Sequence, residues 1–171
     1  MSVMDEESAK AVAARYLSYR ARSRAEVVNR LEEEGFDEDV ISSVVESFTR
    51  YGYIDDEKFC EAFAHDKRVI NGFGNERIRN ELLEKGVDAE VIDKCLVSDD
   101  FNEEEEALRL IRKRFGKATS RWELISKYKE DPFNRNDKAF INEKRKAIDF
   151  LIRKGYSYGT AEEALKAFLN E

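Results

Sequence analysis

The sequence predicts an all-α protein of three tandem three-helix repeats that form an elongated, curved array. One pattern occurs three times, at residues 29–36, 80–87 and 149–156: a charged helical turn ends at a glycine, then an apolar residue, then a new amphipathic helix. A single proline leaves helices uninterrupted elsewhere, and we find no strand pattern of consequence. Neighbouring repeats share a core, so such a body offers a partner a long surface rather than a deep pocket.

The spacing of the three glycines sets the repeat boundaries. Gly35 and Gly86 are 51 residues apart (86 − 35), and Gly86 and Gly155 are 69 apart (155 − 86). The repeats are therefore expected at residues 1–54, 55–100 and 101–171. The 18 additional residues (69 − 51) predict an insertion at 117–136, with a short helix and a turn.

The first repeat begins with a helix expected over about residues 6–21. Its apolar stripe is Ala11, Ala14, Leu17 and Ala21. Ser23 and Glu26 form a capping-box pattern for the second helix, which ends at a glycine suited to the left-handed conformation. Asp37 caps the third helix, whose apolar face is Val40, Ile41, Val44, Val45 and Phe48.

The second repeat follows the connector 51–54. Asp55 caps its first helix, and residues 71–75 break that helix. The apolar positions expected on it are Phe59, Cys60, Phe63, Val69 and Ile70. The next helix ends at Gly86, and Asp88 caps the last one. The apolar positions of that last helix match those of residues 40–45 at the same offset of 51.

The third repeat begins near Asn102. Its first helix starts with four glutamates and ends with basic residues, which complements the helix dipole at both ends. Ala147, Ile148 and Leu151 rebuild the pattern of the second helix, and Ser157 caps the final one.

The net charge of −7 hides strong segregation along the chain. Basic residues dominate segments 11–30, 107–129 and 138–154, while segments 31–66 and 95–106 are acidic. A sequence pI near 5.1 argues against bulk DNA binding, so the basic segments suit a partner with local negative charge. The alternative for any one segment is a solvated helix face.

The residues that usually carry catalysis are too few for an active site. The single histidine, His65, excludes a histidine triad or a multi-histidine metal site. Asp55 and Asp56 are better explained as a helix start than as a paired carboxylate site. We expect no enzyme activity, no cofactor and no metal. Without a signal peptide or a membrane-spanning stretch, and with Cys60 and Cys95 at apolar helical positions, we expect a cytoplasmic protein with buried thiols.

The basic residues are the best functional candidates, because clusters recur near the start of the second helix of each repeat. They are expected to form a discontinuous track along one edge, where arginine can fork onto phosphates or carboxylates. The candidates are Arg15, Arg20, Arg22 and Arg24; Arg68, Arg77 and Arg79; Arg112, Lys113 and Arg114; and Lys144, Arg145 and Lys146.

Together these residues resemble the RecX family of recombination regulators. The fairly specific elements are the connector Gly52-Tyr53-Ile54-Asp55-Asp56 and the later pattern of Gly72, Gly74, Arg77-Ile78, Glu81-Leu82 and Gly86-Val87. The run from Tyr16 to Phe36 and the run Lys154-Gly155-Tyr156-Ser157 extend the likeness over nearly the whole chain.

The resemblance implies a non-enzymatic modulator of the RecA recombinase. Such proteins bind the RecA filament on single-stranded DNA, in its groove or at its growing end, and damp ATP hydrolysis, strand exchange and co-protease activity. We expect a monomer with weak direct DNA contact and no membrane association. The alternatives are a helix-turn-helix-like transcription regulator, which the acidic third helices disfavour, and a helical scaffold for an unrelated protein.

Overall fold

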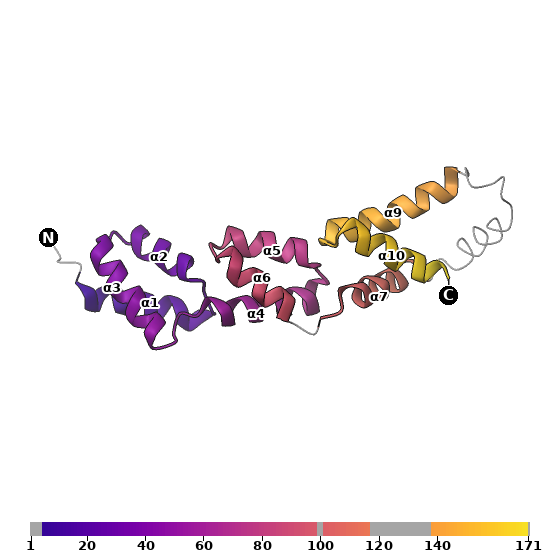
Figure 1. Ribbon diagram of the computed structural model, residues 1–171. Helices are drawn as coiled ribbons and strands as arrows, with labels where there is room; N and C mark the ends of the chain where they lie inside the picture. The colour runs from indigo at the N-terminus through magenta and orange to yellow at the C-terminus, as the bar shows by residue number, and fades with distance from the viewer. Residues whose placement is uncertain (1–4, 99–100, 117–137, 171) are drawn as a thin grey trace. The chain divides into compact units, whose positions relative to one another are not determined.

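The computed structural model describes residues 5–98, 101–116 and 138–170, and these are helical without a β-strand among them. The elements are α1 (Glu6–Tyr19), α2 (Arg24–Glu33), α3 (Glu38–Arg50), α4 (Asp56–Asp66), a π-helical turn η1 (Lys67–Asn71), α5 (Asn75–Glu84), α6 (Ala89–Ser98), α7 (Glu103–Phe115), α9 (Lys138–Lys154) and α10 (Tyr158–Leu169) (Figure 1). The predicted all-α class is confirmed. The predicted insertion lies outside the described residues.

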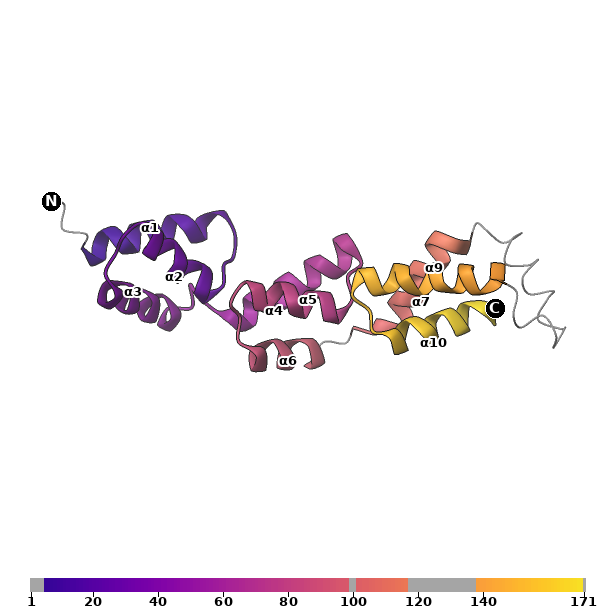
Figure 2. The same cartoon turned by 90° about the horizontal axis from the view of Figure 1, so that it is seen from above.

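The chain divides into two compact units, and the division falls inside α5. Unit 1 comprises Met1–Asp66 and Arg79–Asp99, and unit 2 comprises Lys67–Ile78 and Asp100–Glu171. In unit 1, α1, α2 and α3 pack around a core that includes Val27, Leu31 and Val44. In unit 2, α7, α9 and α10 lie side by side in both views (Figures 1 and 2) and enclose Ile111, Leu151 and Tyr156. The exact repeat boundaries and the curved array stay predictions.

The pattern that occurs three times in the sequence is one helix-ending motif. Gly35, Gly86 and Gly155 all have positive φ, at 84°, 73° and 89°. In each copy the glycine amide donates to the carbonyl three residues back, and the next amide donates to the carbonyl five residues back. This is a Schellman motif, in which the apolar residue after the glycine packs onto the end of the helix. Those apolar residues are Phe36, Val87 and Tyr156, and all three are buried.

The predicted helix starts are largely confirmed. Ser23 and Glu26 form both hydrogen bonds of the capping box at α2. The side chains of Asp55, Asn102 and Ser157 each accept a backbone amide from the first turn of the helix that follows. Asp37 occupies the N-cap position of α3, but its side chain accepts no capping hydrogen bond, so this capping prediction is wrong in its chemistry.

Three of the four residues of the apolar stripe predicted for α1 face away from the core, and Leu17 alone packs against it. Ala11, Ala14 and Ala21 are exposed, whereas Ala9 and Ala13 are fully buried in the core of unit 1. The helix is rich in alanine, so two faces have similar hydrophobicity and the periodicity alone does not choose between them. Packing of Val12, Tyr16 and Leu17 against the core decides which face is inside.

A second correction concerns the end of α4. Val69 and Ile70 were expected to be inside, but they are 68% and 76% exposed, while Arg68 is only 5% exposed. Arg68 follows Cys60 and Ala64 at steps of four residues, so it continues the buried face of α4 into the π-helical turn η1. The next two residues, Val69 and Ile70, lie outside that face and are exposed to solvent.

Candidate partner-binding surfaces at the helix junctions

The first junction joins the start of α2 to the glycine turn after α5, within unit 1. The Ser23 hydroxyl donates to the carbonyl of Lys85 at 2.6 Å, and the Arg24 amide donates to Asp56 Oδ1 at 2.7 Å. A Cβ added at Gly86 would collide with the side chain of Ala25. Glycine at the end of α5 therefore both ends the helix and allows close packing with the start of α2.

Glu26 lies at the centre of this junction and holds three cations. Its carboxylate accepts from Arg20 at 2.7 Å, lies 3.8 Å from Arg22 and lies 3.5 Å from Lys85. Arg22 also stacks over the ring of Tyr16 at 4.1 Å. Two of the predicted binding residues thus hold the junction together. Sequence reasoning named Glu26 only as a capping residue and missed Lys85.

The environment of Glu26 makes junction stability depend on pH. Burial works to raise the pKa of Glu26, but the hydrogen bonds from Arg20 and from the Ser23 amide, with the charge of Lys85, leave the pKa below its usual value. A carboxyl whose folded-state pKa is depressed contributes stability above its unfolded pKa and loses it as pH falls through the folded pKa.

We expect Glu26→Gln to destabilise the protein by about 1 to 2 kcal/mol at pH 7. The loss should shrink towards pH 3, where the wild-type carboxyl also becomes protonated. Urea unfolding followed by circular dichroism at the two pH values measures this difference. A loss that is the same at both pH values would contradict the role assigned to the charge.

Arg15, Arg20 and Arg24 are exposed members of the first cluster, and Arg20 is engaged by Glu26. Arg15 lines a groove of about 300 Å³ with Val12, Tyr16 and Tyr19, and Tyr19 is 72% exposed. A guanidinium beside exposed aromatic rings suits an anionic or planar group of a partner. This groove is the part of the first cluster that is open to a ligand.

The second junction repeats the first within unit 2. The Gly74 amide donates to the carbonyl of Lys154 at 2.9 Å, and Arg77 Nη1 donates to the carbonyl of Arg153 at 3.1 Å. With the glycine spacings between repeats, Lys154 is the equivalent of Lys85 (85 + 69) and Gly74 is the equivalent of Ser23 (23 + 51). Equivalent positions therefore make equivalent contacts.

Arg68 is placed inside unit 2 rather than on its surface. Its Nη2 donates to Asn75 Oδ1 at 2.8 Å, and its guanidinium stacks over Phe101 at 4.1 Å. Glu103 lies nearby and accepts the Asn75 amide at 2.7 Å; burial raises the pKa of that carboxyl, against the effects of the amide and of Arg68. Because the side chain is buried, Arg68 is removed from the predicted partner-binding residues.

The remaining predicted residues are scattered over both units. Arg79 pairs with Asp93, Lys146 pairs with Glu143, and Arg114 stacks over Phe150. Arg112 and Lys113 are exposed near the end of α7, and Lys144 and Arg145 line a groove of about 480 Å³ between α9 and α10. These last two residues and Lys146 were expected at a junction. They lie within α9 instead, because α9 begins at Lys138.

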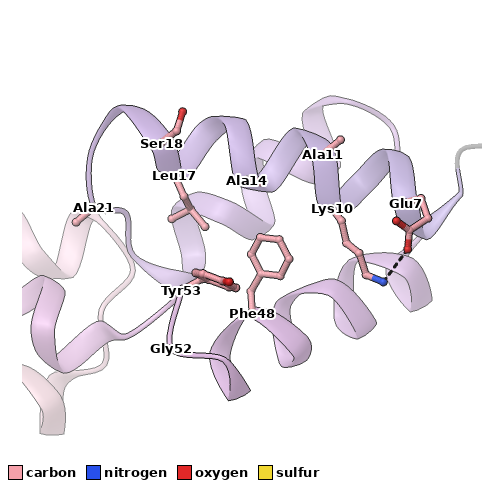
Figure 3. Close-up of a pocket in the computed structure, with 10 residues that line it drawn as sticks. All are labelled: Glu7, Lys10, Ala11, Ala14, Leu17, Ser18, Ala21, Phe48, Gly52 and Tyr53. Atoms are coloured by element: carbon pink, nitrogen blue, oxygen red, sulfur yellow. Dashed lines mark hydrogen bonds and ion pairs between the residues drawn. The ribbon is translucent and has the colours of Figure 1, made fainter.

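A third groove, of about 810 Å³, lies beside α1 (Figure 3). Its floor is the outward alanine face of α1, and Phe48 and Tyr53 project towards that face from the opposite side (Figure 3). The Lys10–Glu7 ion pair closes one end. The apolar stripe expected on this helix lines the groove, and the alanines of that stripe lie at the surface.

Metal-ligating side chains, cysteines and membrane-spanning helices were sought among the described residues. Among them we find no cluster of three or more histidine, cysteine or acidic side chains that could hold a metal ion. Cys60 and Cys95 are buried, as expected. No helix in the described part of the chain is both long and apolar enough to cross a bilayer.

Comparison with known proteins agrees with the tandem three-helix organisation. Residues 9–48 match the first three-helix domain of RecX, and residues 55–96 match the second. The chain is 34% identical over 157 residues to the regulatory protein RecX of Mycobacterium sp. (strain KMS), covering 91% of this chain and 79% of that one. It is 30% identical to the regulatory protein RecX of Bacillus licheniformis, covering 88% of this chain and 51% of that one.

A solved structure shares the fold. The crystal structure of RecX from Lactobacillus salivarius superposes with a TM-score of 0.77 at 23% identity, covering 96% of each chain. Together, the two matched three-helix domains and the relatives at 30% identity and above show that this chain belongs to the RecX family of regulatory proteins.

Proposed function

We propose that this protein binds the RecA recombinase filament on single-stranded DNA and lowers its ATPase, strand-exchange and co-protease activities. Membership of a family of regulatory proteins supports the proposal most directly. Exposed basic side chains at Arg15, Arg24 and Arg145 supply contacts for phosphates or for acidic side chains of the recombinase.

Inhibition of this kind requires differential binding. A ligand alters a filament only if it binds one state of that filament more tightly than another. Contacts spread over two units allow this, because several weak interactions add when the spacing of the recombinase subunits suits them. We propose the same segments, 1–54, 55–100 and 101–171, as the repeats that make these contacts in a monomer.

A helix-turn-helix mode on duplex DNA is less compatible with the surface. The third helices, α3 and α6, begin with Glu38 and Asp39 and with Glu90 in their first turns. Carboxylates there would face the phosphates of a major groove. A duplex-selective shift at physiological salt would favour this alternative.

The direct test is DNA-dependent ATP hydrolysis by the recombinase of the same host. We expect substoichiometric protein to slow turnover. Unchanged turnover at excess protein would overturn the proposal.

Charge reversal at exposed candidates locates the surface. We expect Arg15→Glu and Arg145→Glu each to raise the half-inhibitory concentration about threefold or more, because each brings a carboxylate to an anionic partner. Lys94→Glu is the matched control, since Lys94 is equally exposed and lies outside the candidate set. Arg20→Glu is unsuitable, because it would place a carboxylate against Glu26 and disturb the junction itself.

A further inference from the structure

The two junctions share a backbone arrangement but differ in charge. At the first, the carboxylate of Glu26 lies among three cations. The residue equivalent to Glu26 at the second junction is Arg77 (26 + 51), so the central carboxylate is replaced by a guanidinium. The residue equivalent to Arg22 is Phe73 (22 + 51).

Three cations gather around Phe73 as a result. The Arg77 guanidinium lies 3.8 Å from the ring centroid, and the ammonium groups of Lys67 and Lys154 each lie 5.6 Å from it. Lys154 also donates to the carbonyl of Asn71. Residues 67–77 carry Lys67, Arg68 and Arg77 against one acid, Glu76. The centre of the second junction is therefore a guanidinium, where the first junction has a carboxylate.

The same segment exposes aliphatic surface. Val69 and Ile70, at 68% and 76% exposure, belong to the π-helical turn η1 that begins at Lys67. Adjacent exposed apolar side chains with polar residues around them are typical of protein-interaction surfaces when they form a contiguous patch. Single-turn π-helical segments are frequent at functional sites.

We propose that η1, Phe73, Arg77 and Lys154 form a docking site for an acidic, apolar segment of a partner protein. Carboxylates of that segment meet the cations, and its aliphatic side chains cover Val69 and Ile70. Nucleic acid fits less well, because phosphates gain nothing from Val69 and Ile70, and the guanidinium of Arg77 already covers a face of the Phe73 ring. The identification of this partner with the recombinase rests on the proposed function.

The test uses the full chain and three probes: the recombinase filament, a fluorescent peptide of alternating glutamate and leucine, and fluorescent oligothymidylate. We expect Lys67→Glu with Arg77→Glu to weaken binding of the filament and the peptide about fivefold or more. We expect Val69→Ser with Ile70→Ser to do the same without any change of charge. Lys94→Glu and Val97→Ser are the matched controls, since Val97 is 84% exposed on α6.

The outcomes separate the site from the function. If wild-type protein inhibits the recombinase and both double variants inhibit equally well, the docking site is overturned while the proposed function stands. If the peptide binds in a site-dependent way and the recombinase is unaffected, the proposed function fails and the docking site stands.

An equal loss of oligothymidylate binding in the charge variant, with no effect of the serine variant, would make this a phosphate site. A wild-type dimer that the variants dissociate would make the occupant a second copy of this chain. Circular dichroism confirms that each variant is folded.

Discussion

Gly155→Ala is expected to destabilise the protein by about 3 to 4 kcal/mol, whereas Gly52→Ala should cost only about 1 to 2 kcal/mol. Both glycines have positive φ, at 89° and 75°, so both substitutions strain the backbone. They differ in the space available. A Cβ at Gly155 would lie 2.7 Å from the backbone nitrogen of Arg77 and would also meet its Cβ, whereas a Cβ at Gly52 meets nothing within 4 Å.

Urea unfolding followed by circular dichroism measures both variants. The difference between them isolates the close approach at the second junction, because left-handed strain is common to the two. Equal losses would mean that Gly155 is needed only to end α9, and the packing assigned to this junction would be refuted.

Arg68→Ala is expected to destabilise the protein by about 3 kcal/mol or more. The substitution removes the hydrogen bond to Asn75 and the stacking on Phe101, and it leaves the half-buried Glu103 without the favourable charge of Arg68. Arg153→Ala serves as the control, because Arg153 is exposed and its side chain should contribute less than about 0.5 kcal/mol.

The measurement is again the free energy of unfolding, with filament binding recorded beside it. A structural role predicts a large loss of stability, and any loss of binding should parallel the loss of folded protein. If Arg68→Ala left stability unchanged and weakened filament binding, Arg68 would belong to the partner-binding residues predicted from the sequence.

The sequence was sufficient for the parts of the fold that local chemistry controls. Gly35 ends α2 in the left-handed conformation, and the pair Ser23 and Glu26 begins that helix, as predicted. These features depend on residues close in the chain, so their signals are complete within a few positions. The exception is Asp37, which occupies the N-cap position of α3 but accepts no capping hydrogen bond.

The sequence was insufficient where two faces of a helix compete. Alanines occur on both sides of α1, and only the neighbours in the core select Ala9 and Ala13 over Ala11 and Ala14. The π-helical turn at Lys67 has no clear local signal. Arg68 is buried there and Ile70 is exposed, because Arg68 continues the face of Cys60 and Ala64.

The candidate surface was likewise predicted only in part. Charge counting found the basic clusters, but it did not show that Glu26 holds Arg20, Arg22 and Lys85 together. Lys85 is 59 residues from Glu26 (85 − 26), so no local pattern joins the two. A comparison of equivalent positions in the repeats could have found the exchange of Glu26 for Arg77.

The sequence by itself determined the helical class, the glycine-terminated turns and the number of cations available, because propensity, capping and composition act over short distances. Only the tertiary structure decided which cations hold the junctions and which face solvent. That choice depends on which side chains meet across the chain: Arg68 is buried against Asn75 and Phe101, whereas Arg15 reaches solvent.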